Sequence, residues 1–356
     1  MTVRLAELTT LGVGGPVGEF VECYSEADIV DAVREADESE TPLLVLGGGS
    51  NLVIADEGFV GRVVKDSRSG VVVADASACA GVSVKVDAGT PWDAVAERAV
   101  GEGWVGLEAL AGIPGSTGAT PVQNVGAYGA EVGDAIALVR TWDRAANRVR
   151  TFARAECEFG YRDSVFKRSM RVLEEDRMWH PSPRYVVLSV EFQLPSGSLS
   201  ATIAYAQLAD KLGVALGERA PLAETRAAIL ELRRSKGMVI DAGDPDTRSA
   251  GSFFTNPILD DEGARNLPDD APRYPADGGT KTSAAWLIEQ AGFGKGFALG
   301  ASARATLSTK HTLALTNRGG ATASEIVALA RRVQQGVADR FGVNLEPEPV
   351  FVGVEL

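Results

Sequence analysis

The glycine-rich turn in residues 46–56, "LGGGSNLVIAD", constrains the fold more than any other stretch of this chain. It leaves a short apolar run, "TPLLVL", and leads into extended sequence in place of a helical pattern. Such turns typically hold phosphate with their backbone N–H groups. However, the usual dinucleotide-binding fold requires a helix N-terminus directly after its glycines, and the P-loop requires a Gly-Lys-Ser/Thr ending. The turn therefore predicts phosphate binding outside the Rossmann and P-loop folds.

Composition narrows the class of protein. The chain has 356 residues, of which 45% are hydrophobic, so we expect two or three domains. A net charge of −13 argues against nucleic acid as a partner, although a local cationic pocket for a small anion stays possible. There is no signal-peptide pattern and no apolar run of roughly 20 residues, so we expect a cytoplasmic protein without membrane contact.

Cysteine and histidine usage bears on redox state and metals. The three cysteines, Cys23, Cys79 and Cys157, are scattered and form no C-x-x-C, which favours reduced thiols. Since His180 and His311 are the only histidines, a histidine-built metal site is nearly excluded and we expect no metal.

Periodicity and capping signals predict an α+β chain with a boundary between a β-rich half and a smaller α+β part near 195–220. Thr90 is expected to cap a helix that has Pro91 at its first position. Ser25 pairs with Asp28 to cap another helix, in which Ile29 and Val33 recur at helical spacing, and Thr322 with Glu325 forms a capping box. Helices are predicted at 25–39, 91–101, 222–236, 283–292 and 322–341, an antiparallel meander at 60–88, a hairpin at 138–152 and a strand at 184–194.

A second segment rich in small residues, "LAGIPGSTGATPVQNVGAYGAEVGD" (110–134), accompanies the first turn. Small residues let the backbone approach a ligand closely. Either loop alone could be an ordinary tight turn. Together, with the amides of Gln123 and Asn124, they favour a ligand that has both a pyrophosphate and a flat ring.

The stretches "GGGSNLVIADEGF" and "GIPGSTGATPVQNVGAYG" resemble the flavin-binding domain of the UDP-N-acetylenolpyruvoylglucosamine reductase (MurB) family, in its long form with a tyrosine-bearing loop. The resemblance runs from about Leu8 to Val352. It implies a two-subdomain FAD-binding domain of the PCMH/VAO type plus a smaller C-terminal α+β substrate domain. The implied ranges are 1–70 for the first subdomain, to which 350–356 could return, 71–215 for the second, and 216–349 for the substrate domain.

The resemblance implies non-covalent FAD, with the first loop at its diphosphate and the second beside its isoalloxazine ring. Neither loop contains a Cys or His that could tether the flavin. The implied cofactor-binding residues are Gly47, Gly48, Gly49, Ser50, Asn51, Leu52, Ile113, Pro114, Gly115, Ser116, Gly118, Gln123, Asn124, Gly126 and Tyr128.

Three further motifs, "YRDSVFK", "AGSFFTNP" and "NLEPEPVFVG", complete the resemblance. It makes Arg162 the arginine that stabilises a developing enolate, Ser252 the proton donor, and Glu348 a carboxylate that works with both. By itself the first motif could bind an anion through Arg162 and Lys167 beside an aromatic ring, although a surface Arg-Asp pair is the commoner explanation. The other two would indicate a turn and an edge strand with solvated carboxylates.

The resemblance also implies a substrate, UDP-N-acetylglucosamine enolpyruvate, which NADPH would reduce through the flavin to UDP-N-acetylmuramate. Thr255 stands where the family commonly has lysine, and Pro349-Val350 follow Glu348 where a cationic residue is common. The implied substrate-binding residues are Tyr205, Arg233, Lys236, Asn256, Tyr274, Lys281 and His311.

Two alternatives keep part of this interpretation. One is an oxidase or dehydrogenase of the same flavin superfamily that acts on an alcohol or hydroxy acid. The other is a nucleotide-binding module without catalysis, against which the Ser252, Arg162 and Glu348 set weighs. We expect a monomer, because no exposed apolar stripe requires a partner.

Overall fold

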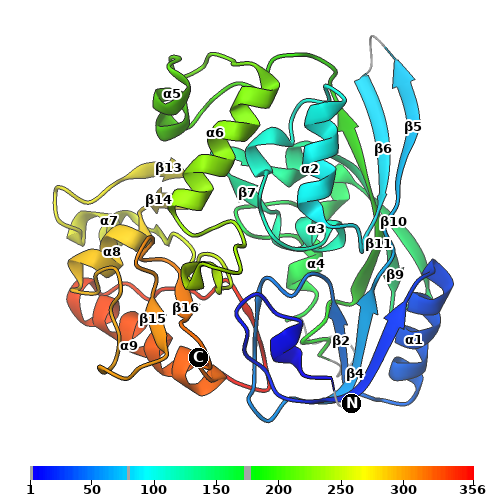
Figure 1. Cartoon of the computed structure of the whole chain (residues 1–356), viewed down its shortest axis with the longest axis horizontal. Helices are drawn as coiled ribbons and strands as arrows, with labels where there is room; N and C mark the ends of the chain where they lie inside the picture. Colours follow the sequence, from blue (N-terminus) through cyan, green and yellow to red (C-terminus); the bar gives the residue numbers. More distant parts are fainter. Residues whose placement is uncertain (1–2, 78–80, 172–177) are drawn as a thin grey trace. The chain divides into compact units, whose positions relative to one another are not determined.

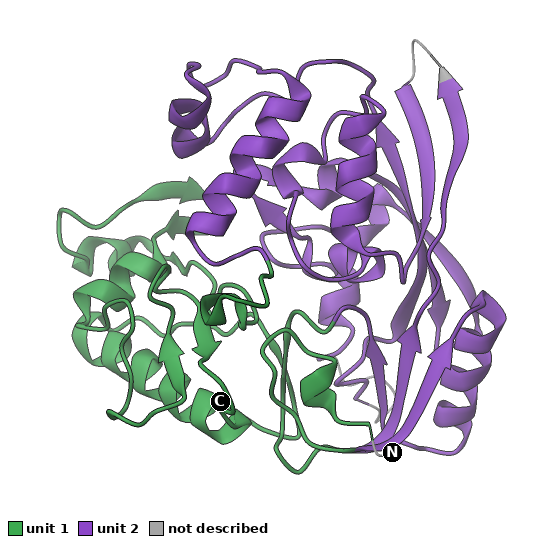
Figure 2. Cartoon of the chain, viewed as in Figure 1, with its two compact units in different colours: residues 1–16, 49–59, 240–356 green, residues 17–48, 60–239 purple. Residues whose placement is uncertain are grey.

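The computed structural model describes residues 3–77, 81–171 and 178–356, so Cys79 lies outside the described residues. The chain forms two compact units, each built from separated segments (Figure 2). Unit 1 consists of residues 1–16, 49–59 and 240–356, and unit 2 consists of residues 17–48 and 60–239. The glycine turn therefore passes from one unit to the other between Gly48 and Gly49.

A five-stranded antiparallel sheet forms the largest part of unit 2 (Figure 1). The predicted hairpin at 138–152 and the strand at 184–194 are confirmed as its members. Trp92 packs against Phe192 with ring centroids 5.9 Å apart, and both side chains are buried in its core. The strand order is β10 (Arg148–Ala153), β9 (Ile136–Asp143), β11 (Tyr185–Leu194), β6 (Gly81–Asp87) and β5 (Val71–Ser77).

A smaller sheet and helix α1 (Glu26–Glu38) stand at the start of unit 2. The capping box of Ser25 and Asp28 begins α1, and its apolar side chains Ile29 and Val33 are buried. The strand order is β1 (Val17–Cys23), β4 (Phe59–Asp66) and β2 (Leu43–Leu46). The glycine turn at Gly47 thus leaves the end of a β-strand.

The meander expected at 60–88 is only partly right. Strands β5 and β6 pair antiparallel, but β4 pairs with β2 in parallel and belongs to the smaller sheet. Alternating Val-rich sequence indicates a strand and leaves its partner undetermined, since the partner is chosen by tertiary packing.

The expected cap of helix α2 (Trp92–Gly101) is also wrong. Pro91 occupies the N-cap position, and Thr90 donates its hydroxyl to the Gly70 carbonyl at 3.3 Å. The helix itself is confirmed, because Trp92, Val95, Ala96 and Ala99 are buried along one side.

Unit 2 ends in helices α5 (Ala206–Leu212) and α6 (Leu222–Ser235), which pack through Leu208 and Ile229. The predicted helix at 222–236 is confirmed by α6. The shorter elements of this unit are α3 (Thr120–Gln123), α4 (Val165–Arg168), β7 (Gly126–Ala127) and β8 (Ala130–Glu131).

Unit 1 is organised around helix α9 (Ala323–Phe341), whose side chains Ile326, Leu329, Val333 and Val337 are buried. The predicted capping box of Thr322 and Glu325 is confirmed. The other elements of unit 1 are β3 (Leu52–Ile54), α7 (Asp261–Asn266), α8 (Ala284–Gln290), β12 (Ile258–Leu259), β13 (Tyr274–Ala276), β14 (Gly279–Lys281), β15 (Ala305–Leu307), β16 (Leu315–Asn317) and β17 (Val350–Val352).

Strand β17 pairs in parallel with β3, so the C-terminal strand lies beside the segment that follows the glycine turn. The α+β fold class is confirmed. The assignment of 1–70, 71–215 and 216–349 to cofactor and substrate domains stays a prediction. Within the described residues, no helix combines the length and apolarity that crossing a membrane requires.

Candidate functional site

The two glycine loops meet backbone to backbone within unit 2. A Cβ built on Gly48 would lie 2.6 Å from the Cα of Gly115, and one built on Gly47 would lie 2.2 Å from the Ser116 hydroxyl. Real Cβ atoms do not approach other atoms so closely, so a side chain at Gly48 would push the two backbones apart, and one at Gly47 would displace the Ser116 hydroxyl. The Gly115 carbonyl also accepts a hydrogen bond from Trp92 N at 3.0 Å, which ties the second loop to the start of α2.

Gly47, Gly48, Gly49 and Gly115 together are called the glycine cradle, and Gly49 is its part in unit 1. Its φ of +62° is left-handed, and a Cβ there would lie 1.9 Å from the Leu8 carbonyl oxygen. Its own carbonyl accepts from Thr10 N at 3.0 Å. The turn therefore consists of backbone with no room for side chains, as expected of a turn that holds phosphate by N–H groups.

Polar groups of the second loop are linked to Arg162. The Arg162 guanidinium donates to the Gly126 carbonyl at 2.7 Å, and its backbone has the left-handed φ of +55°. Lys167 donates its ammonium to the Arg162 carbonyl at 2.8 Å and to Gln123 Oε1 at 3.1 Å. The structure thus brings the predicted Arg162, Gln123 and Gly126 together. Lys167, absent from the predicted site, connects them.

Asn124 is fully buried, and its side chain bonds within the protein. Its amide donates to Glu131 Oε2 at 2.7 Å and to the Gly160 carbonyl at 2.8 Å, while its oxygen accepts from Gly133 N. Asn124 therefore fixes the shape of the loop, and its role toward a cofactor stays a prediction.

A cluster of two tyrosines and two cations forms a second centre in unit 2. The rings of Tyr128 and Tyr205 meet edge to face with centroids 5.4 Å apart, and the Lys236 ammonium lies 5.6 Å from the Tyr128 ring centroid. Lys236 also donates to Gln207 Oε1 at 2.8 Å. The predicted flavin residue Tyr128 is thus next to the predicted substrate residues Tyr205 and Lys236. The sequence contained no signal for Gln207.

The electrostatics of this cluster favour an anion. Burial lowers the pKa of Arg233 to about 10, and its Nε has no hydrogen-bond partner among the described residues. Burial, and then the charge of Arg233, lower the pKa of Lys236, and burial raises the pKa of Tyr128. Two cations beside each other repel, and an anion between them removes this cost. An added phosphate would supply the missing acceptor.

Ser252 and Glu348 lie on adjacent extended segments of unit 1. Glu348 N donates to the Phe253 carbonyl at 2.9 Å, and Thr255 N donates to the Glu346 carbonyl at 3.0 Å. Phe253 is buried, and its N–H donates to the Leu313 carbonyl at 2.7 Å, so Ser252 precedes a rigid anchor. Arg162 belongs to unit 2, and the other two predicted catalytic residues belong to unit 1.

The remaining predicted substrate residues belong to unit 1. Tyr274 and Lys281 oppose each other across β13 and β14. The Asn256 side-chain oxygen accepts from Ala284 N at 2.9 Å at the start of α8, and His311 N donates to Ser308 Oγ at 3.2 Å. Tyr274 and Lys281 are therefore brought together on one small sheet, and His311 lies on a separate loop.

Asp246 anchors the loop that leads to Ser252. Asp246 is 3% exposed, and its carboxylate accepts from Thr309 N at 2.8 Å, from the Thr309 hydroxyl at 2.6 Å, and from Arg318 at 2.8 Å. Burial by itself would raise the pKa of Asp246, but the hydrogen bonds of Thr309 and the charge of Arg318 outweigh it and lower the pKa.

This lowered pKa predicts acid sensitivity. The stabilisation by Asp246 is fully present above the unfolded-state pKa of about 3.9 and is lost as the pH falls through the lower folded-state value. We expect Asp246→Asn to cost about 2 kcal/mol near pH 7 and to show a smaller fall in stability than wild type below about pH 4. Urea unfolding measured from pH 7 to pH 3 checks this, and equal pH slopes for the two proteins would contradict it.

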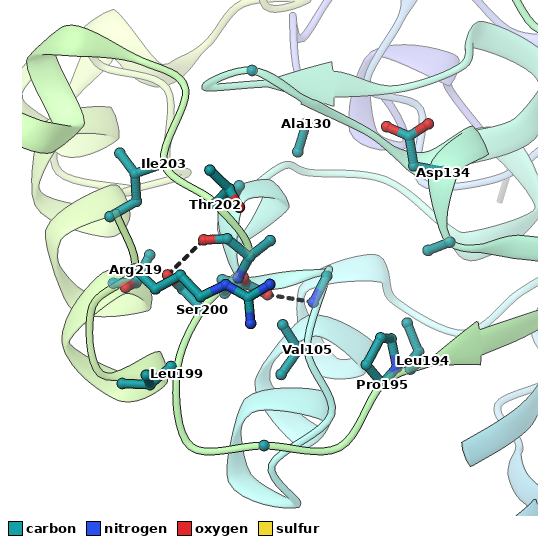
Figure 3. A pocket seen from close by; sticks show the side chains of 18 of the residues that line it. Val105, Ala130, Asp134, Leu194, Pro195, Leu199, Ser200, Thr202, Ile203 and Arg219 are labelled. Carbon is teal, nitrogen blue, oxygen red and sulfur yellow. Dashed lines mark hydrogen bonds between the residues drawn. The ribbon is translucent and has the colours of Figure 1, made fainter. Parts of the chain in front are cut away.

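Unit 2 also has a cavity of about 640 Å³, lined by Val105, Leu194, Ile203 and Arg219 among others (Figure 3). Of the predicted site residues, only Tyr128 lines it. The buried Glu108 in its wall accepts from Gly106 N and Ala201 N, each at 2.6 Å. The cavity is therefore distinct from the meeting point of the glycine loops.

Metal and thiol chemistry find little support in the described part of the chain. In residues 3–77, 81–171 and 178–356, no three His, Cys, Asp or Glu side chains are grouped so that they could hold a metal ion. Cys23 and Cys157 are free and buried, and burial raises the pKa of their thiols to about 11 and about 12. Both thiols are therefore protonated near neutral pH.

Comparison with known proteins agrees with this geometry. Residues 18–151 match the family described as an FAD binding domain, and residues 244–352 match the C-terminal domain of UDP-N-acetylenolpyruvoylglucosamine reductase. The first match contains both glycine loops, and the second contains Ser252 and Glu348. The fold and these matches define an FAD-dependent oxidoreductase.

Relatives cover almost the whole chain. The UDP-N-acetylenolpyruvoylglucosamine reductase of Thermobifida fusca is 52% identical over 99% of this chain and 98% of its own length. That of Cutibacterium acnes is 49% identical over 99% of this chain and 89% of its own. The crystal structure of the enzyme from Thermus caldophilus matches with a TM-score of 0.64 and 27% identity, covering 99% and 98% of the two chains. The chain belongs to the UDP-N-acetylenolpyruvoylglucosamine reductase family.

Proposed function

We propose that this protein reduces UDP-N-acetylglucosamine enolpyruvate to UDP-N-acetylmuramate with NADPH as the reductant. The observation that supports it most is the pair of neighbouring cations Arg233 and Lys236 beside Tyr128. Within residues 3–77, 81–171 and 178–356, neither cation forms an ion pair with a carboxylate, as suits a site that receives the diphosphate of a nucleotide sugar. Tyr128 lies within the loop expected at the flavin, so substrate and cofactor would be neighbours.

The glycine cradle fits FAD. Gly47, Gly48 and Gly49 have no space for a Cβ, and Gly115 closes the cradle from the second loop. These residues would hold the diphosphate of FAD, and Gln123 and Gly126 would lie toward its ring. When bound, FAD supplies the hydride that reduces the vinyl carbon of the substrate.

The side chains supply charge and a proton. Arg162 offers a permanent cation with paired N–H donors, which suits the negative charge that develops on the carboxylate side of the enolpyruvate. Ser252 would donate its hydroxyl proton to the adjacent carbon, and Glu348 would assist it. A serine hydroxyl is a weak acid, but an enolate carbon is basic enough to take its proton when the geometry is held.

The cluster of Tyr128, Tyr205, Arg233 and Lys236 gives a prediction for substrate affinity. Lys236→Met is expected to raise the KM for the UDP-sugar by about 10-fold to 100-fold, because a hydrogen bond to a charged group contributes about 1.5–3 kcal/mol. The matched control is Lys211→Met, because the Lys211 ammonium pairs at 2.6 Å with the exposed Glu231 across the same two helices. Steady-state kinetics check both, and an equal KM for the two variants would contradict the assignment.

One experiment tests the function as a whole. The purified protein is loaded with FAD, its visible spectrum is recorded, and it is reduced anaerobically with NADPH before UDP-N-acetylglucosamine enolpyruvate is added. We expect the flavin band to bleach and to return only with this substrate. A flavin that bleaches but ignores the enolpyruvate would refute the proposed substrate and favour an alcohol or hydroxy-acid oxidoreductase. A monomeric state and a cytoplasmic location stay predictions.

A further inference from the structure

The segment around Glu348 has few main-chain donors of its own. Pro347 and Pro349 flank it and lack an N–H, so a regular ladder of hydrogen bonds is interrupted on both sides. Instead, residues that are distant in the sequence form hydrogen bonds with both the N–H and the carbonyl of Glu348. Its N–H donates to the Phe253 carbonyl at 2.9 Å, and its carbonyl accepts from Asn51 Nδ2 at 3.2 Å.

Asn51 is itself held to the same segment by its main chain. Its carbonyl accepts from Val350 N at 2.9 Å. The next residue, Leu52, pairs with Val350 as the first pair of the parallel β3–β17 ladder. The side chain and the main chain of Asn51 thus contact residues on either side of Pro349. Asn51 lies two residues after Gly49, so one residue connects the end of the three glycines to Glu348.

We propose that Asn51 is a positioning residue for Glu348. Its amide fixes the Glu348 carbonyl and thereby the place from which the Glu348 carboxylate acts beside Ser252. This role differs from a contact with the cofactor, because the Asn51 side-chain amide donates to Glu348, whereas the turn is expected to bind a diphosphate through main-chain N–H groups. The inference rests on the proposed function.

The two half-reactions provide the test. Asn51→Ala removes the amide donor, and Asn51→Ser removes it while keeping a polar side chain. We expect flavin reduction by NADPH to stay within about twofold of wild type, and flavin reoxidation by UDP-N-acetylglucosamine enolpyruvate to slow by about tenfold, the effect of one hydrogen bond. Stopped-flow absorbance measures both rates, and titration with FAD measures cofactor affinity.

A matched control separates positioning from general loosening. Gln334 Nε2 donates to the Leu345 carbonyl at 2.7 Å, which is the same type of bond on the same C-terminal segment. Gln334→Ala is expected to lower stability and to leave both half-reactions unchanged. If Gln334→Ala slows reoxidation as much as Asn51→Ala does, the inference is overturned.

A double-mutant cycle decides whether Asn51 acts through Glu348. In a Glu348→Gln background, Asn51→Ala is expected to slow reoxidation by less than about twofold, because the carboxylate it positions is already gone. Full additivity would overturn the inference. So would an equal slowing of both half-reactions with weaker FAD binding, since Asn51 would then serve only the cofactor. A wild-type flavin that is not reoxidised by the enolpyruvate would instead refute the proposed function, and this inference with it.

Discussion

Ser252→Ala is expected to lower turnover by about 10²-fold to 10⁴-fold while FAD binding stays intact, because general acid catalysis contributes this much. The substitution removes only the hydroxyl. The backbone anchors on either side remain, namely the hydrogen bond of Phe253 N to Leu313 and the bridge of Phe254 to Pro347. A loss of rate would therefore report the proton donor and not the fold. Flavin absorbance during single turnover measures it.

The control for this variant is a second serine on the same segment. Ser249 is buried, its hydroxyl accepts from Gly251 N at 3.3 Å, and its main chain bridges to Thr316. Ser249→Ala should reduce stability by about 1 kcal/mol and leave turnover nearly unchanged. Unchanged turnover in Ser252→Ala would remove Ser252 from the mechanism.

Arg162→Lys is expected to lower turnover by about 10²-fold to 10³-fold, as is typical when a group that stabilises developing negative charge is removed. Lysine keeps the positive charge but loses the planar pair of donors and the bond from the guanidinium to the Gly126 carbonyl. Arginine and lysine both carry a Cβ, so the left-handed φ of +55° at position 162 destabilises the backbone by a similar amount in the two proteins. Steady-state kinetics with saturating NADPH measure the effect.

The matched control is Arg168→Lys. Arg168 forms ion pairs with Asp163 and Glu158 at a partly exposed position close to Arg162 in the chain. Surface ion pairs contribute about 0–1 kcal/mol, so this variant should stay within about twofold of wild type. Equal rates for the two lysine variants would show that charge alone suffices at position 162.

Local signals were sufficient for most helices. The capping box at Ser25 and Asp28 and the apolar spacing of Ile29 and Val33 predicted α1, and the same kind of signal predicted α9. Each depends on residues three or four apart, which meet in any helix. The cap at Thr90 failed for a tertiary reason, because that hydroxyl bonds to Gly70.

Sheet membership depended on tertiary structure. The strand β4 was visible as Val-rich sequence, yet its parallel pairing with β2 was not. A strand's composition reflects a half-buried pleated surface, and many partners satisfy that. Likewise, nothing local predicted that β17 returns to β3.

The candidate site divides in the same way. The glycines, Arg162, Ser252 and Glu348 were predicted from contiguous motifs that resemble the family, and the flavin-binding class predicted with them is confirmed. The contacts that hold these residues were not predicted, because they join segments that are distant in the sequence. Examples are the hydrogen bonds of Lys167 to Gln123, of Lys236 to Gln207 and of Asn51 to Glu348. The sequence by itself thus determined the family of the protein and named the candidate catalytic residues, and only the tertiary structure decided which neighbours hold them, because hydrogen bonds between distant segments form only after the chain has packed.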